Sequence, residues 1–176
     1  MWKYHKMTAY HSRALVCDTR QKAGKHDAKE QWWEEQNIPT LRASLPVGDY
    51  AWIAPVSVDT KRDLYELAMD LQADHARFKR EVVRAKDSGC RLYVLVENKE
   101  GVRTLSDLAK WVEPKSHVIM RRRRSGKAAQ IHGSQLAKAC VTMQDRYGVT
   151  FLFCAPEETA QKVIELLGDP KGDQNG

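Results

Sequence analysis

Apolar residues recur along this chain with two spacings, and these predict alternating strands and helices. Short apolar or alternating runs predict strands at 13–19, 41–53, 56–61, 91–97 and 149–155. Steps of three and four residues predict helices at 27–36, 63–87, 105–112, 134–147 and 157–167. The helix at 63–87 carries one continuous apolar stripe, and we expect His75 on that stripe to be a buried core residue.

The order of these elements predicts the fold class. Strands that alternate with helices indicate an α/β domain, with a mixed central sheet flanked by helices on both faces. The strand at 41–53 is interrupted at Gly48, and its expected antiparallel neighbour is the strand at 56–61. A length of 176 residues suits one domain with one core.

The domain boundaries follow from changes in composition along the chain. We expect an N-terminal extension at 1–12 and a single folded domain at 13–168. This domain contains a basic insertion at about 115–130 and is followed by a polar tail at 169–176.

The composition narrows the classes of protein to which the chain can belong. Hydrophobic residues make up 42% of the chain and charged residues 30%, which is typical of a folded, soluble protein. The net charge of +6 favours a polyanionic partner. No apolar run is long enough to cross a membrane and no secretory signal is visible, so we expect a cytoplasmic protein. Four widely separated cysteines without a C-x-x-C spacing indicate buried, reduced thiols and no zinc site.

The candidate chemistry lies in the pair of strands at 41–53 and 56–61. Residues 56–61 alternate between apolar and polar, so Asp59 and Lys61 share one face. A hairpin partner that carries Asp49 would bring a second carboxylate beside them. Two carboxylates suit a hard divalent cation, and a nearby ammonium stabilises negative charge in a reacting phosphate. The alternative is a plain turn at Asp49 and a surface ion pair between Asp59 and Lys61.

The same residues resemble a known signature. Gly48-Asp49 followed by Asp59-Thr60-Lys61 resembles the P-D…(D/E)-x-K signature of the restriction-endonuclease-like fold, and more narrowly the G-D…E-R-K-x₃-D pattern of the XPF-type nuclease domain. Residues 16–20 are similar to the opening D-x-R-E strand of that family, with Gln21 in place of the glutamate. The resemblance covers 14–167 and is strongest to stand-alone forms of the domain carried by phages and prophages.

The chain also departs from the family pattern. Asp59 and Thr60 replace the Glu and Arg of E-R-K, which keeps a carboxylate but loses a guanidinium. The last acidic residue of the pattern would fall at Tyr65, so that part of the match fails.

The resemblance implies a set of catalytic residues. Asp49 and Asp59 would ligate Mg²⁺ or Mn²⁺ together with the backbone carbonyl of Thr60, and Asp18 would complete the metal shell or hold a metal-bound water. Lys61 would orient the attacking water or screen charge in the transition state.

Other charged residues are candidates for DNA contact or for support of the site. Candidates for phosphate contacts are Arg20, Arg77, Arg121, Arg122, Arg123, Arg124 and Lys127. The alternative interpretation of the run of four arginines is a solvated loop that does not contact DNA. Glu81 and Glu97 match positions that in the family lie next to the catalytic residues. The alternative for Arg20 and Arg77 is that they pair with these two glutamates and do not contact phosphates.

The predicted function is hydrolysis of DNA by a metal-dependent endonuclease, selective for branched or flapped DNA, as used in DNA repair and recombination. Two alternatives remain open: a catalytically silent DNA-binding or scaffold subunit, and a junction resolvase or sequence-specific endonuclease on the same fold. The resemblance further implies a homodimer that pairs through the helices at 134–147 and 157–167.

Overall fold

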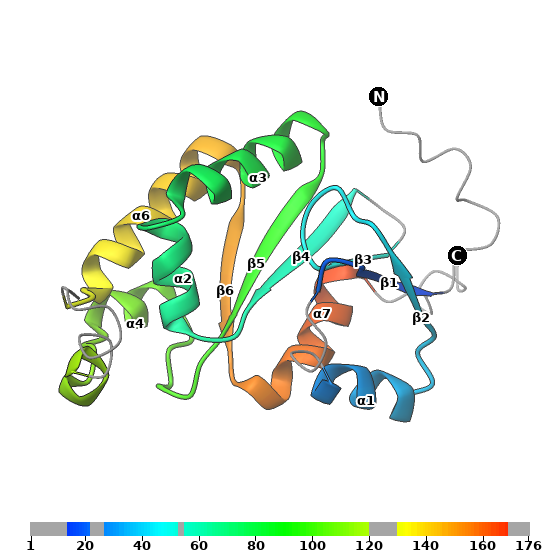
Figure 1. Cartoon of the computed structure of the whole chain (residues 1–176), viewed down its shortest axis with the longest axis horizontal. Helices are drawn as coiled ribbons and strands as arrows, with labels where there is room; N and C mark the ends of the chain where they lie inside the picture. Colours follow the sequence, from blue (N-terminus) through cyan, green and yellow to red (C-terminus); the bar gives the residue numbers. More distant parts are fainter. Residues whose placement is uncertain (1–13, 22–26, 53–54, 120–129, 169–176) are drawn as a thin grey trace.

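Six strands form one mixed sheet in the computed structural model, which describes residues 14–21, 27–52, 55–119 and 130–168 (Figure 1). The order across the sheet is β2-β1-β3-β4-β5-β6, and the pairs β1–β2, β4–β5 and β5–β6 are parallel. The short β3 pairs antiparallel with both β1 and β4. The strands are β1 (Leu15–Asp18), β2 (Thr40–Ala43), β3 (Tyr50–Ala51), β4 (Val56–Lys61), β5 (Arg91–Glu97) and β6 (Thr150–Cys154).

Helices cover both faces of this sheet, as the sequence predicts (Figure 1). One face carries α2 (Leu64–Leu71), α3 (His75–Asp87), α4 (Leu105–Lys110) and α6 (Gly133–Tyr147). The other face carries α1 (Asp27–Glu35) and α7 (Thr159–Leu167), the latter preceded by a 3₁₀ turn at Pro156–Glu158. Residues 115–119 are also helical. The predicted α/β class with a mixed central sheet is confirmed.

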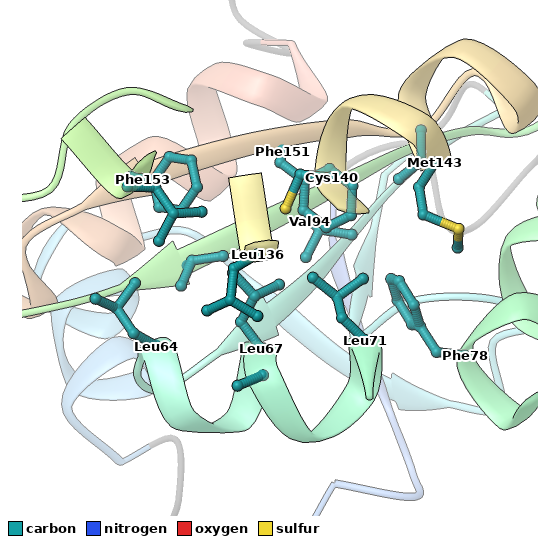
Figure 2. Close-up of a cluster of buried hydrophobic side chains, with 14 of the residues drawn as sticks. Leu64, Leu67, Leu71, Phe78, Val94, Leu136, Cys140, Met143, Phe151 and Phe153 are labelled. Carbon is teal, nitrogen blue, oxygen red and sulfur yellow. The ribbon is translucent and has the colours of Figure 1, made fainter. Parts of the chain in front are cut away.

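Each face of the sheet has its own apolar core. The larger core packs α2, α3 and α6 onto β5 and β6, with Leu67, Phe78 and Phe151 among its buried side chains (Figure 2). On the opposite face, Trp33 of α1 packs edge-on against Tyr50 at a centroid distance of 5.1 Å. The Trp33 Nε1–H donates to the backbone carbonyl of Ala160, which ties α1 to α7. The central strands are therefore held rigidly from both sides.

The predicted strand at 41–53 is in fact two separate strands. β2 and β3 pair with β1 on its two opposite sides, one parallel and one antiparallel. The chain between them, 44–49, must therefore pass around the carboxyl end of β1. The expected antiparallel pairing with β4 holds for β3 alone.

The predicted long helix at 63–87 is also two helices, α2 and α3, separated at 72–74. Both present apolar residues to the same core, so the apolar stripe continues across the break. His75 lies at the start of α3 and is exposed, so its expected burial is wrong.

Three of the four thiols, those of Cys17, Cys140 and Cys154, are buried, and all four cysteines are free, as predicted. Burial raises the pKa of the Cys17 thiol to about 11 and that of Cys140 to about 12. Among the described residues, no helix combines the length and apolar character that crossing a membrane requires.

Candidate active site

The crossing segment, residues 44–49, brings its backbone against the end of β1. The Leu45 amide donates to Asp18 Oδ1 at 3.2 Å, and the Asp18 amide donates to the carbonyl of Asp49 at 2.9 Å. Gly48 adopts a positive φ of 72°, and its amide donates to Glu81 Oε1 at 3.1 Å. These bonds fix the position of Asp49 beside β4.

Asp49 is held against β4 by Thr60. Its Oδ2 accepts from the Thr60 amide at 2.8 Å and from the Thr60 hydroxyl at 2.7 Å. One carboxylate oxygen is thus bound twice by the same residue, which orients the whole group. The side chain of Thr60 therefore has a contact that the sequence did not predict.

Asp59 and Lys61 project from the same face of β4, as the alternation predicts. The Lys61 Nζ lies 2.6 Å from Asp59 Oδ2 and 2.5 Å from Asp70 Oδ2. It also lies 5.3 Å from the centroid of the Phe78 ring. Burial alone would lower the pKa of Lys61, but Asp59 and Asp70 raise it above its ordinary value, so the ammonium stays charged.

The Asp59 carboxylate lies in an electrostatically unfavourable position. Burial raises the pKa of Asp59 from 3.8 to about 8; Lys61 opposes that rise, whereas Asp49 and Glu81 add to it. A cation beside Asp49 and Asp59 would relieve this repulsion, which is a physical reason to expect cation binding there.

Asp70 is a buried acid that the sequence analysis missed. It is 4% exposed, and it contacts Lys61 through one oxygen and Arg77 through the other. A signal existed in the sequence, because Asp70 lies three residues after Leu67 and so falls on the apolar face of α2. An acid at such a position requires a cationic partner.

These residues line a cavity of about 350 Å³ with an acidic floor and a basic rim. Its lining comes from β1, the crossing segment, β4 and α3: Asp18, Arg20, Gly48, Asp49, Asp59, Lys61, Arg77, Arg80, Glu81 and Arg84. Arg80 and Arg84 are a second omission of the sequence analysis. They follow Arg77 by three and seven residues, a spacing that places all three on one side of α3.

The arginines at the rim have partners other than those the sequence suggested. Arg20 donates to Asp18 Oδ2 at 2.6 Å and to the carbonyl of Leu45 at 2.5 Å. Arg77 pairs with Asp70 while remaining half exposed. The alternative pairing of these two arginines with Glu81 and Glu97 is therefore wrong.

Glu97 does not lie with the other predicted residues. Val94 and Val96 are the register partners of Asp59 and Lys61 and point to the same face, so Glu97, one residue further along β5, points to the opposite one. There it forms a buried ion pair with Lys29 of α1. Arg121 to Arg124 and Lys127 lie outside the described residues.

The three predicted acids do not form a ready-made metal cage. Within the described ranges, no three His, Cys, Asp or Glu side chains are grouped closely enough to hold an ion. The Asp18 carboxylate already accepts from Arg20 and from the Leu45 amide. Mg²⁺ keeps several waters and often uses only one or two carboxylates, so Asp49 and Asp59 by themselves fit a hydrated Mg²⁺ or Mn²⁺.

The fold is thus an α/β domain with an acidic cavity beside the central strands of its mixed sheet. Residues 17–167 match the model of the ERCC4 domain, and the chain therefore belongs to this family of DNA nucleases. Some members of the family are inactive, and its active nucleases generally depend on a divalent metal.

Solved structures share the fold of this chain. XPF from Aeropyrum pernix is similar over 87% of this chain, with 19% identity and a TM-score of 0.58. The same protein in complex with DNA is similar over 88%, with 18% identity and a TM-score of 0.59. The chain spans 64% and 63% of those two chains. No curated protein matches it in sequence.

Proposed function

We propose that this protein is a divalent-metal-dependent endonuclease that hydrolyses phosphodiester bonds in branched or flapped DNA. The observation that carries the proposal is the convergence of Asp49, Asp59 and Lys61 on one cavity with a rim of arginines. Acidic residues on the floor suit a cation, and cationic residues on the rim suit the phosphates on either side of the bond to be cut.

Each residue of the cavity has a proposed role. Asp49 and Asp59 would hold Mg²⁺ or Mn²⁺, with the Thr60 carbonyl as a further candidate ligand. The bound ion would polarise the phosphate and lower the pKa of the attacking water. Lys61 would donate a hydrogen bond to the charge that develops on the phosphate. Asp18, already bonded to Arg20, would hold that arginine and accept from a water on the ion.

The rim would bind the DNA backbone on both sides of the cavity. Arg20 lies at the end of β1, while Arg77, Arg80 and Arg84 follow α3. Phosphate contacts of this kind give affinity without base specificity. Recognition of a branch point would then depend on the shape of the DNA. The basic residues 121–124 and Lys127 are proposed to extend this contact.

The direct test is cleavage of flap, fork, four-way and plain duplex DNA, with Mg²⁺, with Mn²⁺ and with EDTA. We expect cleavage of the branched substrates only when a metal is present. Equal cleavage of plain duplex would favour a less selective endonuclease, and preference for the four-way substrate would favour a junction resolvase. Tight binding without cleavage under any condition would identify a silent DNA-binding subunit.

Two substitutions separate catalysis from binding. Asp49→Asn should abolish cleavage because it removes a metal ligand, and Lys61→Ala should slow it by about 100- to 1,000-fold because it removes a donor to the transition state. Both variants should bind DNA about as tightly as the wild type, measured by fluorescence anisotropy in Ca²⁺. Normal cleavage by either variant would contradict the site assignment.

We also propose that the chain pairs as a homodimer. The two helices named from the sequence, α6 and α7, lie on opposite faces of the sheet (Figure 1). The proposal therefore centres on α6, whose outer surface carries the exposed Val141.

A further inference from the structure

Asp70 lies on α2, outside the sequence motif and beneath the cavity of the proposed nuclease site. Its two oxygens contact two different cations, Lys61 through Oδ2 at 2.5 Å and Arg77 through Oδ1. A buried carboxylate is costly unless it is paired, so this position is maintained by those two contacts.

The Lys61 ammonium is shared almost equally between two acids. Asp59, which belongs to the cavity, lies 2.6 Å from the nitrogen, and Asp70, which does not line the cavity, lies 2.5 Å from it. A lysine ammonium has three donors and can serve both acids at once. Without Asp70, the remaining carboxylate contact that the structure shows for this ammonium is the one with Asp59.

That loss would alter the proposed metal site. An ammonium bound only to Asp59 would neutralise the carboxylate that has to receive the cation. It would also lie displaced toward Asp59. Asp70 attracts the same ammonium at 2.5 Å, and this contact opposes both effects.

Arg77 fixes the position of Asp70. The arginine extends from α3, with its side chain about half exposed, and its guanidinium reaches the buried oxygen that does not contact Lys61. The contacts therefore run in series from the surface to the cavity floor, through Arg77, Asp70, Lys61 and Asp59.

We propose that Asp70 is a positioning residue, which holds the Lys61 ammonium between two carboxylates and thereby leaves Asp59 able to bind the metal ion. This inference rests on the proposed function and deepens it. It assigns Asp70 no contact with substrate.

The test compares Asp70→Asn with Asp74→Asn. The first keeps the shape of the side chain and removes its charge. The second is a matched control, because Asp74 also approaches Arg77, at 3.9 Å, but is exposed and makes no side-chain capping bond. We expect Asp70→Asn to weaken Mn²⁺ binding in calorimetry and to lower kcat, each by about 10- to 100-fold, with KM for DNA unchanged. Asp74→Asn should match the wild type in all three.

Two further measurements keep the result interpretable. NMR signals of the lysine ammonium groups, with the Lys61 signal assigned by its absence from Lys61→Ala, should show a slowly exchanging Lys61 ammonium in the wild type that is lost in Asp70→Asn. The signal of the other ammonium that is buried among the described residues, that of Lys29, should remain. This readout requires neither metal nor cleavage. Asp70→Glu, which restores the charge, should recover part of the Mn²⁺ affinity. If Asp70→Asn does not fold, Arg77→Gln should reproduce the weaker Mn²⁺ binding, because it releases Asp70.

The outcomes separate the two proposals. A folded Asp70→Asn with wild-type Mn²⁺ affinity, kcat and ammonium signal overturns the role of Asp70, and so does wild-type Mn²⁺ binding by Arg77→Gln when Asp70→Asn is unfolded. A wild-type chain that never cleaves DNA overturns the proposed function, whereas the ammonium signal still decides whether Asp70 holds Lys61.

Discussion

Gly48 is the residue on which the placement of Asp49 depends most directly. Its φ of 72° lies in the left-handed region, and a Cβ built there would meet Ser57 Oγ at 2.3 Å and the Val58 carbonyl at 3.0 Å. A side chain at this position is therefore excluded twice, by backbone conformation and by the close approach of β4.

We predict that Gly48→Ala destabilises the protein by about 3 kcal/mol and strongly reduces cleavage, because the crossing segment must move away from β4. Gly89→Ala is the matched control. Gly89 has a similar φ of 68°, but its added Cβ would meet nothing within 4 Å, so the cost should be only about 1 kcal/mol. Urea unfolding measures both. Equal losses would mean that the contact with β4 is unimportant.

Asp59 links the acidity of the site to the stability of the fold. Because its pKa is raised from 3.8 to about 8, the folded chain keeps a proton that the unfolded chain has lost across this range. Its contribution to stability is therefore present below about pH 4 and is lost as the pH rises toward about 8.

We predict that the unfolding free energy of the wild type falls more steeply between pH 4 and 8 than that of Asp59→Asn. Urea unfolding at intervals of pH, without divalent ions, gives both curves. Their difference isolates Asp59 because the other titrating groups are common to both proteins. Parallel curves would show that burial does not shift this acid.

Among single residues, the sequence predicts those whose role follows from alternation or from the signature. Asp59 and Lys61 share a face of β4 because strand geometry requires it. Asp70 could not be found in this way, because it reaches Lys61 only through the packing of α2 against the sheet. The position of Glu97 along the chain matches an acidic residue of the family pattern. Strand alternation nevertheless directs its side chain to the face of the sheet opposite Asp59 and Lys61.

At the scale of elements, the spacing of apolar residues shows which side of the chain is buried. It does not show whether the chain forms one continuous element or two. The apolar stripe of 63–87 persists through the break at 72–74 because α2 and α3 pack on one core, so the pattern cannot reveal that there are two helices. The alternation at 41–53 likewise hides the crossing segment, whose Leu45 and Val47 are buried without belonging to a strand. By contrast, β5 is predicted with its exact bounds, 91–97, because its apolar run is short and clearly bounded.

The element that we expect to contribute most to DNA affinity is α3. We predict that replacing both Arg80 and Arg84 with Gln weakens binding of every DNA. The slope of the logarithm of the binding constant against the logarithm of the salt concentration should also become shallower, by the equivalent of about two phosphate contacts. Lys79→Gln is the control, since Lys79 is exposed on the same helix but does not line the cavity. Anisotropy titrations at several salt concentrations provide the slopes. An unchanged slope in the double variant would exclude this side of α3 from the DNA interface.

For the whole molecule, the proposed assembly makes a clear prediction. If the chain pairs through α6, Val141→Arg should convert a dimer into a monomer in sedimentation velocity, because it places a charge in the interface. Met69→Arg, at an apolar residue on α2 that is somewhat more exposed than Val141, should leave the dimer intact. A wild-type monomer at micromolar concentration would contradict the proposal.

Among the residues that the structure describes, those that line the cavity all fall in the range from Asp18 to Arg84. The strands and helices that follow, β5, β6, α4, α6 and α7, complete the sheet and its two cores but supply none of the described lining. The residues proposed to act in catalysis and the remaining scaffold are thus largely divided between the two halves of the described chain. Mutation can therefore vary the second half while the proposed catalytic residues are inherited unchanged.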